Sequence, residues 1–134
     1  NIRRGKQQRL TLGNLNALRD WGHAKDYSRA MWMILQHHTP EDFVIATGEQ
    51  YSVKQFVERC APYFDMKIEW YGQGVDQVGV DTNTGKTIIE VDSKYFRPAE
   101  VETLLGDSTK ARTVLGWKPE YTFDSLVEEM CIYE

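Results

Sequence analysis

The sequence predicts an α/β fold, because stretches with helical spacing of apolar residues alternate along the chain with short apolar runs that end in turn residues. Helical spacing is clearest over residues 24–37, and strand-like runs occur at residues 43–46 and 67–70. We therefore expect mixed helices and short strands. The apolar face expected to be buried on the first helix consists of Ala24, Tyr27, Met31, Ile34 and Leu35.

The N-terminal elements follow from local signals. Residues 1–9 are basic and polar, and we expect them to be the end of a helix that Gly5 closes. Residues 10–12 predict a short strand. The apolar run at 43–46 predicts a buried strand, which needs a sheet to join. Because this is the one convincing buried strand, we expect its neighbours to lie outside the chain, which would then be incomplete.

Three helix starts can be recognised by their capping residues. Ser52 with Gln55 forms a capping box for a helix that ends near Pro62. Asp107 can cap a helix over residues 108–115 that stops at a glycine, and Thr122 can cap one over 123–133. Between them, the strand patterns at 78–80 and 87–91 flank Asn83-Thr84-Gly85, which predicts a hairpin.

The composition excludes several classes of protein. The chain has 134 residues, enough for one domain, and its formal net charge of −4 argues against a nucleic-acid binder. No run of about 18 apolar residues occurs, so no membrane span is predicted. Cys60 and Cys131 have no spacing suited to zinc, and we expect buried thiols in a reducing compartment.

One polar cluster lies at residues 19–26, just before and within the first turn of the predicted helix. Arg19 could bind phosphate oxygens with both arms of its guanidinium group, close to a helix N-terminus that favours anions. The alternative is an ion pair of Arg19 with Asp20 or Asp26 that fixes the loop. For both carboxylates, and for His23, structural roles are favoured over catalytic ones.

A second cluster lies at residues 95–102. Pro98 restricts Arg97 to an extended backbone, and Glu100 could accept hydrogen bonds from ribose hydroxyls. The alternative is a surface pair of Arg97 and Glu100. Two arginines from distant loops could clamp a diphosphate. Four aromatic residues could stack on a base, although core positions are favoured for them: Trp70, Tyr71, Tyr95 and Phe96.

Several long motifs resemble those of one enzyme family. They are residues 12–27 (LGNLNALRDWGHAKDY), 40–48 (PEDFVIATG), 95–107 (YFRPAEVETLLGD) and 109–119, which ends in LGWKP. In order and content they resemble the GDP-mannose 4,6-dehydratase family of extended short-chain dehydrogenase/reductases. The resemblance implies that residues 1–134 are the C-terminal, nucleotide-sugar-binding part of an extended Rossmann-type fold, without the N-terminal NADP-binding region.

The resemblance also implies a function. Such an enzyme is an NADP-dependent lyase that converts GDP-mannose to GDP-4-keto-6-deoxymannose, the first step toward GDP-fucose. The positions that match the family's substrate-binding residues are Arg19 and Arg97, for the diphosphate, and Glu100, for the ribose. No catalytic, cofactor-binding or metal-binding residue is carried over. The spacing Tyr63-x-x-x-Lys67 matches the family's catalytic pair, but we interpret it as coincidence because it lies at a helix end.

The resemblance sets further expectations. We expect a cytoplasmic homo-oligomer that binds GDP-mannose, with no nucleic-acid or membrane partner, and we expect the 134-residue chain alone to be inactive. Two alternatives remain: another nucleotide-sugar epimerase or reductase, and a binding module that has lost its chemistry.

Overall fold

The computed structural model describes residues 1–97, 99 and 101–133, which form two compact units. Unit 1 comprises Asn1–Ala17 and Ser52–Glu102, and unit 2 comprises Leu18–Tyr51 and Thr103–Glu134. Each unit is therefore built from two stretches that are far apart in the sequence. Helices and strands are both present, which confirms the predicted α/β class.

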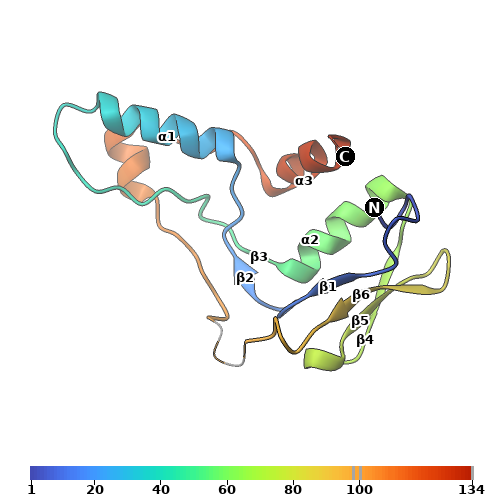
Figure 1. The fold of residues 1–134 in the computed structure, drawn as a ribbon. Helices are drawn as coiled ribbons and strands as arrows, with labels where there is room; N and C mark the ends of the chain where they lie inside the picture. The colour runs from blue at the N-terminus through green and yellow to red at the C-terminus, as the bar shows by residue number, and fades with distance from the viewer. Residues whose placement is uncertain (98, 100, 134) are drawn as a thin grey trace. The chain divides into compact units, whose positions relative to one another are not determined.

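Unit 1 contains a four-stranded mixed sheet with the order β1-β6-β5-β4 (Figure 1). β1 (Leu10–Leu12) runs parallel to β6 (Lys86–Val91), which forms a hairpin with β5 (Val78–Asp81); β4 (Ile68–Tyr71) is antiparallel to β5. These strands confirm the predictions to within one residue at each end. The pairing of β1 with β6 joins segments on either side of the stretch that belongs to unit 2.

Helix α2 (Val53–Cys60) covers this sheet in unit 1 (Figure 1). Its predicted capping box is confirmed, since Ser52 accepts from the amide of Gln55 at 3.0 Å while the Gln55 side chain accepts from the amide of Ser52 at 2.7 Å. Val53 and Val57 pack against a buried cluster. The fully buried members of that cluster are Leu15, Ile88 and Ile89.

Two helix predictions in unit 1 were wrong in detail. Residues 1–9 do not end a helix: the amides of Gly5 and Lys6 close a single turn, with Gly5 at φ +69°. Pro62 does not end the helical backbone either. It lies in the first turn of a 3-10 helix, η1 (Ala61–Phe64), that continues α2, because a proline at that position has no amide that would need a partner.

Unit 2 consists mainly of helices. α1 (Ala24–Gln36), the π-helical turn η3 (Ala111–Leu115) and α3 (Phe123–Ile132) match the three predicted helices, and Gly116 ends η3 at φ +69°. α1 packs on η3 (Figure 1), since Ala30, Ala111 and Trp117 form one buried cluster. A short sheet pairs β2 (Leu18–Arg19) with β3 (Tyr51–Ser52), and Leu18 also bridges to Thr103.

The face of α1 that is buried differs from the predicted one. Met31 and Leu35 are 64% and 80% exposed, whereas Ala30 is fully buried against Ala111 and Trp117. The helix has apolar residues on more than one side, so spacing alone could not identify the side that packs within unit 2. The predicted face is therefore wrong at Ala24, Met31 and Leu35, all of which are exposed.

Residues 43–46 do not form the predicted buried strand. They have no regular secondary structure, although Ala46 is buried and the side chains of Phe43 and Ile45 pack beside the Ala30–Trp117 cluster. Segment 43–46 runs so close to Gly106 that a Cβ there would lie 2.2 Å from that of Ala46. The apolar run therefore predicted burial correctly for Ala46 but not for Val44, which is exposed. Strand pairing also needs a neighbouring strand, and none of the strands the structure describes pairs with this segment.

The described residues contain neither a membrane-spanning helix nor a group of side chains suited to a metal ion. No helix among them is long and apolar enough to cross a membrane. Likewise, no group of three or more His, Cys, Asp or Glu side chains within the described part of the chain could hold a metal ion.

Candidate functional site

Arg19, the first predicted phosphate ligand, lies in unit 2 on the two-residue strand β2. Its side chain is half-buried, and Nη1 donates to the carbonyl oxygen of Leu18 at 2.8 Å. The same carbonyl accepts from the amide of Leu104 at 3.1 Å. The guanidinium group is thus attached to a backbone position that is itself held by residues 103–104.

Asp20 has the structural role that its sequence position predicted. Its Oδ1 accepts from the amide and the hydroxyl of Thr47 at 2.9 and 2.7 Å, and its Oδ2 accepts from the amide of Gly48 at 3.0 Å. Gly48 has φ +82°, a left-handed conformation that glycine adopts without strain. The sequence left open an ion pair between Arg19 and Asp20. In the structure the Asp20 carboxylate accepts from three donors of residues 47–48.

Asp26 is 2% exposed and joins α1 to residues 117–121. Its two carboxylate oxygens accept from the amides of Glu120 and Tyr121, both at 3.1 Å, and from Arg29 at 3.3 Å. The indole of Trp117 donates to the backbone carbonyl of Asp26 at 3.0 Å. A buried carboxylate needs such partners, and here they make Asp26 a structural residue.

His23 caps the N-terminus of α1, which confirms the hydrogen-bonded role predicted for it. Nδ1 accepts from the amide of Lys25 at 3.0 Å, so the ring proton lies on Nε2, which is 3.3 Å from Glu129. The ring stacks on Tyr121, with centroids 3.9 Å apart. Just before it, Gly22 is required by packing, because a Cβ there would lie 1.9 Å from the hydroxyl oxygen of Tyr27.

Lys25 and Glu129 form the principal surface ion pair beside this cap, with Nζ and Oε1 2.6 Å apart. The hydrogen bond from Lys25 holds the pKa of Glu129 below its usual range, and hydrogen bonds to Glu129 and Tyr121 raise the pKa of Lys25. Both side chains are therefore ionised at neutral pH. They connect α1 to α3 on the solvent side of the cap.

Unit 2 also contains a small hollow of about 180 Å³, lined in part by Thr47 and Arg112. Arg112, which sequence reasoning missed, donates from Nη2 to the carbonyl of Thr47 at 2.9 Å and from Nε to Ser108 at 3.0 Å. No local motif marks Arg112, because both contacts depend on how η3 packs. The hollow is lined by Trp21, Thr47, Glu49, Tyr51, Arg112, Pro119, Tyr121, Thr122 and Phe123.

The second predicted cluster lies in unit 1. Arg97 is exposed there, while Pro98 and Glu100 lie outside the described residues. Arg19 and Arg97 thus belong to different units, and their convergence on one diphosphate stays a prediction. Of the four aromatic residues, Trp70 has the predicted core position: it packs against the buried cluster of unit 1 and donates to Glu58 at 2.8 Å.

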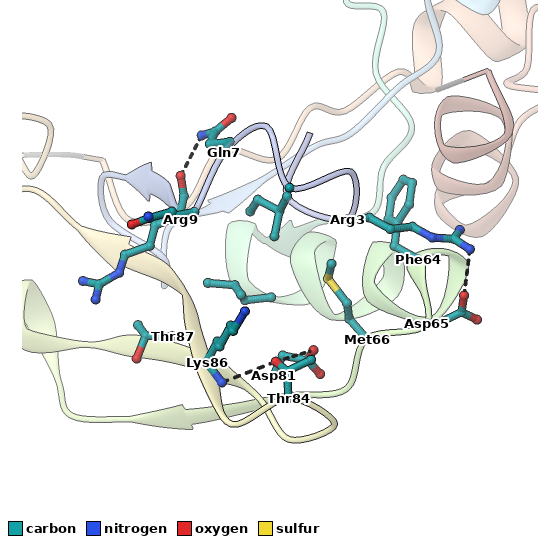
Figure 2. A pocket seen from close by; sticks show the side chains of 14 residues that line it. Arg3, Gln7, Arg9, Phe64, Asp65, Met66, Asp81, Thr84, Lys86 and Thr87 are labelled. Carbon is teal, nitrogen blue, oxygen red and sulfur yellow. Dashed lines mark hydrogen bonds and ion pairs between the residues drawn. The ribbon is translucent and has the colours of Figure 1, made fainter.

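A larger groove, of about 870 Å³, lies in unit 1 between the N-terminal turn and the β5–β6 hairpin (Figure 2). Several of its charged residues have structural partners. Arg3 pairs with Asp65 at 3.0 Å, and Asp81 accepts from the amides of Lys67 and Asn83 and from the Thr84 hydroxyl. Burial would raise the pKa of Asp81, but these hydrogen bonds outweigh it and lower that pKa. Asp81 therefore has a structural role in this groove.

Tyr63 and Lys67 do not share a helix. η1 ends at Phe64, and Asp65 has φ 59°, which turns the chain before Lys67. A tyrosine and a lysine four residues apart lie on one face only within a continuous helix. The spacing Tyr63-x-x-x-Lys67 therefore does not form the arrangement of the family's catalytic pair.

Comparisons with known proteins identify close relatives. The sequence model of a family described as GDP-mannose 4,6 dehydratase matches residues 1–130. The chain is 52% identical to GDP-mannose 4,6-dehydratase of Vibrio cholerae over 98% of its length, and 53% identical to the human GDP-mannose 4,6 dehydratase over 94%. It covers only 37% and 34% of those proteins, so it spans about a third of their length.

Solved structures support the fold. The RMD structure from Pseudomonas aeruginosa, complexed with NADPH, superimposes with a TM-score of 0.72 at 20% identity, over 98% of this chain and 37% of that one. The dTDP-glucose 4,6-dehydratase of Bacillus anthracis, in complex with NAD, has a TM-score of 0.67 at 18% identity, over 94% and 34%. At these identities the similarity establishes an α/β fold shared with about a third of these Rossmann-type chains and no more.

Proposed function

Because the chain belongs to the GDP-mannose 4,6-dehydratase family, we propose that it is the nucleotide-sugar-binding portion of an enzyme that converts GDP-mannose to GDP-4-keto-6-deoxymannose. The observation that carries the proposal is the extent of the similarity. About half of the residues are identical to dehydratases over nearly the whole chain. The reaction is an internal hydride transfer through NADP with loss of water.

The substrate-binding roles are proposed for three residues. Arg19 and Arg97 bind the diphosphate, and Glu100 binds the ribose. The sequence supports the role of Arg19, because Arg19 lies within the motif of residues 12–27 that resembles the family. A guanidinium group gives the planar, two-armed recognition of phosphate that lysine does not.

The cofactor is proposed to bind outside residues 1–134. The described residues do not fit a nicotinamide dinucleotide: they contain no glycine-rich loop between a strand and a helix, and Tyr63 and Lys67 do not share a helix. NADP would supply the hydride chemistry when bound by the rest of the polypeptide. We accordingly propose that residues 1–134 alone are inactive, and that the whole protein is a cytoplasmic homo-oligomer.

The test is the substitution Arg19→Ala in the full-length polypeptide that carries this chain. Loss of a charge-assisted contact to a buried phosphate should weaken GDP binding by about 2 kcal/mol, roughly 30-fold, in titration calorimetry. Arg97→Lys should cause a smaller loss, because the charge remains while the fork is removed. Unchanged affinity and turnover in Arg19→Ala would show that the assignment is wrong.

Two controls complete this test. Arg9→Ala removes an arginine whose partner is the surface carboxylate of Glu90, 3.0 Å away, and should leave GDP affinity unchanged. UDP and dTDP should bind more weakly than GDP to the unaltered protein. Preference for either would indicate a different nucleotide-sugar enzyme, the alternative considered from the sequence.

A further inference from the structure

We propose that Asp20 is a positioning residue that sets the place of Arg19 in the diphosphate site. This inference rests on the proposed function. Regular secondary structure restrains the backbone around Arg19 only weakly. Arg19 lies on a strand of two residues, and residues 20–23 have no regular secondary structure before α1 begins. A short strand with few ladder hydrogen bonds cannot by itself hold a side chain rigidly enough for recognition.

The contact between Asp20 and residues 47–48 supplies the missing restraint. Two successive backbone amides, of Thr47 and Gly48, point at the two carboxylate oxygens, and the Thr47 hydroxyl adds a third donor. Successive amides that converge in this way form a concave site for an anion. In unit 2 the protein's own carboxylate fills that site, one residue after Arg19 in the chain.

A third segment locks the receiving loop. The Thr47 carbonyl accepts from Arg112, and Arg112 is held in turn by the Ser108 hydroxyl. The amide, hydroxyl and carbonyl of Thr47 are thus all used, and residues 20, 47–48 and 108–112 form one connected latch. Together with the hydrogen bond from Leu104 to Leu18, the latch restrains the backbone on both sides of Arg19.

The latch also satisfies the carboxylate of Asp20, which lies next to Arg19 in the sequence. We therefore assign one effect to this contact: it restrains Arg19 while the Asp20 carboxylate stays hydrogen-bonded to residues 47–48.

A double-mutant cycle distinguishes positioning from a purely structural role. The full-length polypeptide is prepared unaltered, as Asp20→Asn, as Arg19→Ala and as the double variant, and GDP is titrated into each by calorimetry. Asp20→Asn should weaken GDP binding about tenfold, because an amide group cannot accept from all three donors. In the Arg19→Ala background the same substitution should cause no further loss, since Asp20 acts through Arg19.

Two more variants keep the test decisive. Thr47→Val removes only the hydroxyl donor and should weaken GDP binding about threefold, which serves if Asp20→Asn fails to fold. Asp81→Asn is the matched control: Asp81, in unit 1, also accepts from two backbone amides and a threonine hydroxyl. It should lower the melting temperature without changing GDP affinity.

The outcomes separate this inference from the function on which it rests. If Arg19→Ala does not weaken GDP binding, the proposed function is wrong and this inference is overturned with it. If Arg19→Ala weakens binding but Asp20→Asn and Thr47→Val do not, the proposed function stands and only the positioning role is overturned. Equal loss from Asp20→Asn in both backgrounds would also overturn it, because Asp20 would then act independently of Arg19.

Discussion

The two units are stabilised in different ways. Unit 1 has a sheet of four strands and one helix, and its core is aliphatic, with Leu15, Ile88 and Ile89 buried together. Unit 2 has three helical segments around small residues and Trp117, and its separate segments are joined by Asp20 and Asp26. Backbone ladders hold the first unit together, whereas the second is held by hydrogen bonds that carboxylates accept from remote amides.

The units also differ in the apolar surface that they expose. One side of α1 presents Met31 and Leu35 to solvent, together with Trp32, although the opposite side is buried in unit 2. Unit 1 exposes large apolar residues mainly singly, in loops and at strand edges. The packing of the separate segments of unit 2 depends on a few polar contacts. Removing one of these contacts should therefore destabilise remote segments, which similar changes in unit 1 should not do.

The largest expected effect is that of Trp117→Ala, which should destabilise unit 2 by about 4 kcal/mol through loss of buried volume and of the hydrogen bond to Asp26. The matched change in unit 1, Ile89→Ala, should cost about 3 kcal/mol. Hydrogen exchange on the full-length protein should show lost protection in α1 and α3 for the first and in the sheet for the second. Loss of protection in both units from either change would contradict independent cores.

A smaller effect should come from two equally buried carboxylates. Asp26→Asn should destabilise by about 3 kcal/mol, because buried amide donors lose charged acceptors. Asp81→Asn should cost about 2 kcal/mol, since its partners lie in or beside a single hairpin. Hydrogen exchange should locate the first loss in both α1 and residues 117–132, and the second only around residues 67–88. A loss confined to α1 in Asp26→Asn would show that the carboxylate does not join remote segments.

The smallest effect should be the same in the two units. Each has a capping box, formed by Ser52 with Gln55 at α2 and by Thr122 with Ser125 at α3. Ser52→Ala and Thr122→Ala should each lower the free energy of unfolding by about 1 kcal/mol, with lost amide protection limited to the first turn of the helix. A much larger loss at Thr122 would mean that α3 is held by its cap rather than by its buried residues Phe123 and Val127.

Local signals predicted most helices and strands. The caps at Ser52 and Thr122 and the hairpin at Asn83-Thr84-Gly85 depend on residues within a few positions of each other, and all appear as expected. Segment 43–46 and the buried face of α1 were mispredicted for one shared reason. An apolar residue shows that a side chain favours burial, but its neighbours in sequence do not specify what will cover it.

In the candidate site, too, some features could be predicted from local sequence and others could not. The structural roles of Asp20, Asp26 and His23 followed from residue types near a helix start, and the structure confirms them. Their partners could not be predicted, because Thr47 lies 27 residues from Asp20 and Tyr121 lies 95 from Asp26. Arg112 was missed altogether, since it acquires its contacts only when η3 packs in unit 2.

By itself, the sequence determined the α/β class, the capped helices, the hairpin and membership of the GDP-mannose 4,6-dehydratase family, because each depends on short-range spacing or on the order of motifs along the chain. Only the tertiary structure decided that β1 pairs with β6, that the carboxylates of Asp20 and Asp26 join remote segments, and which side of α1 is covered. The physical reason is that burial and pairing are properties of two surfaces, and a linear sequence describes each surface without its partner.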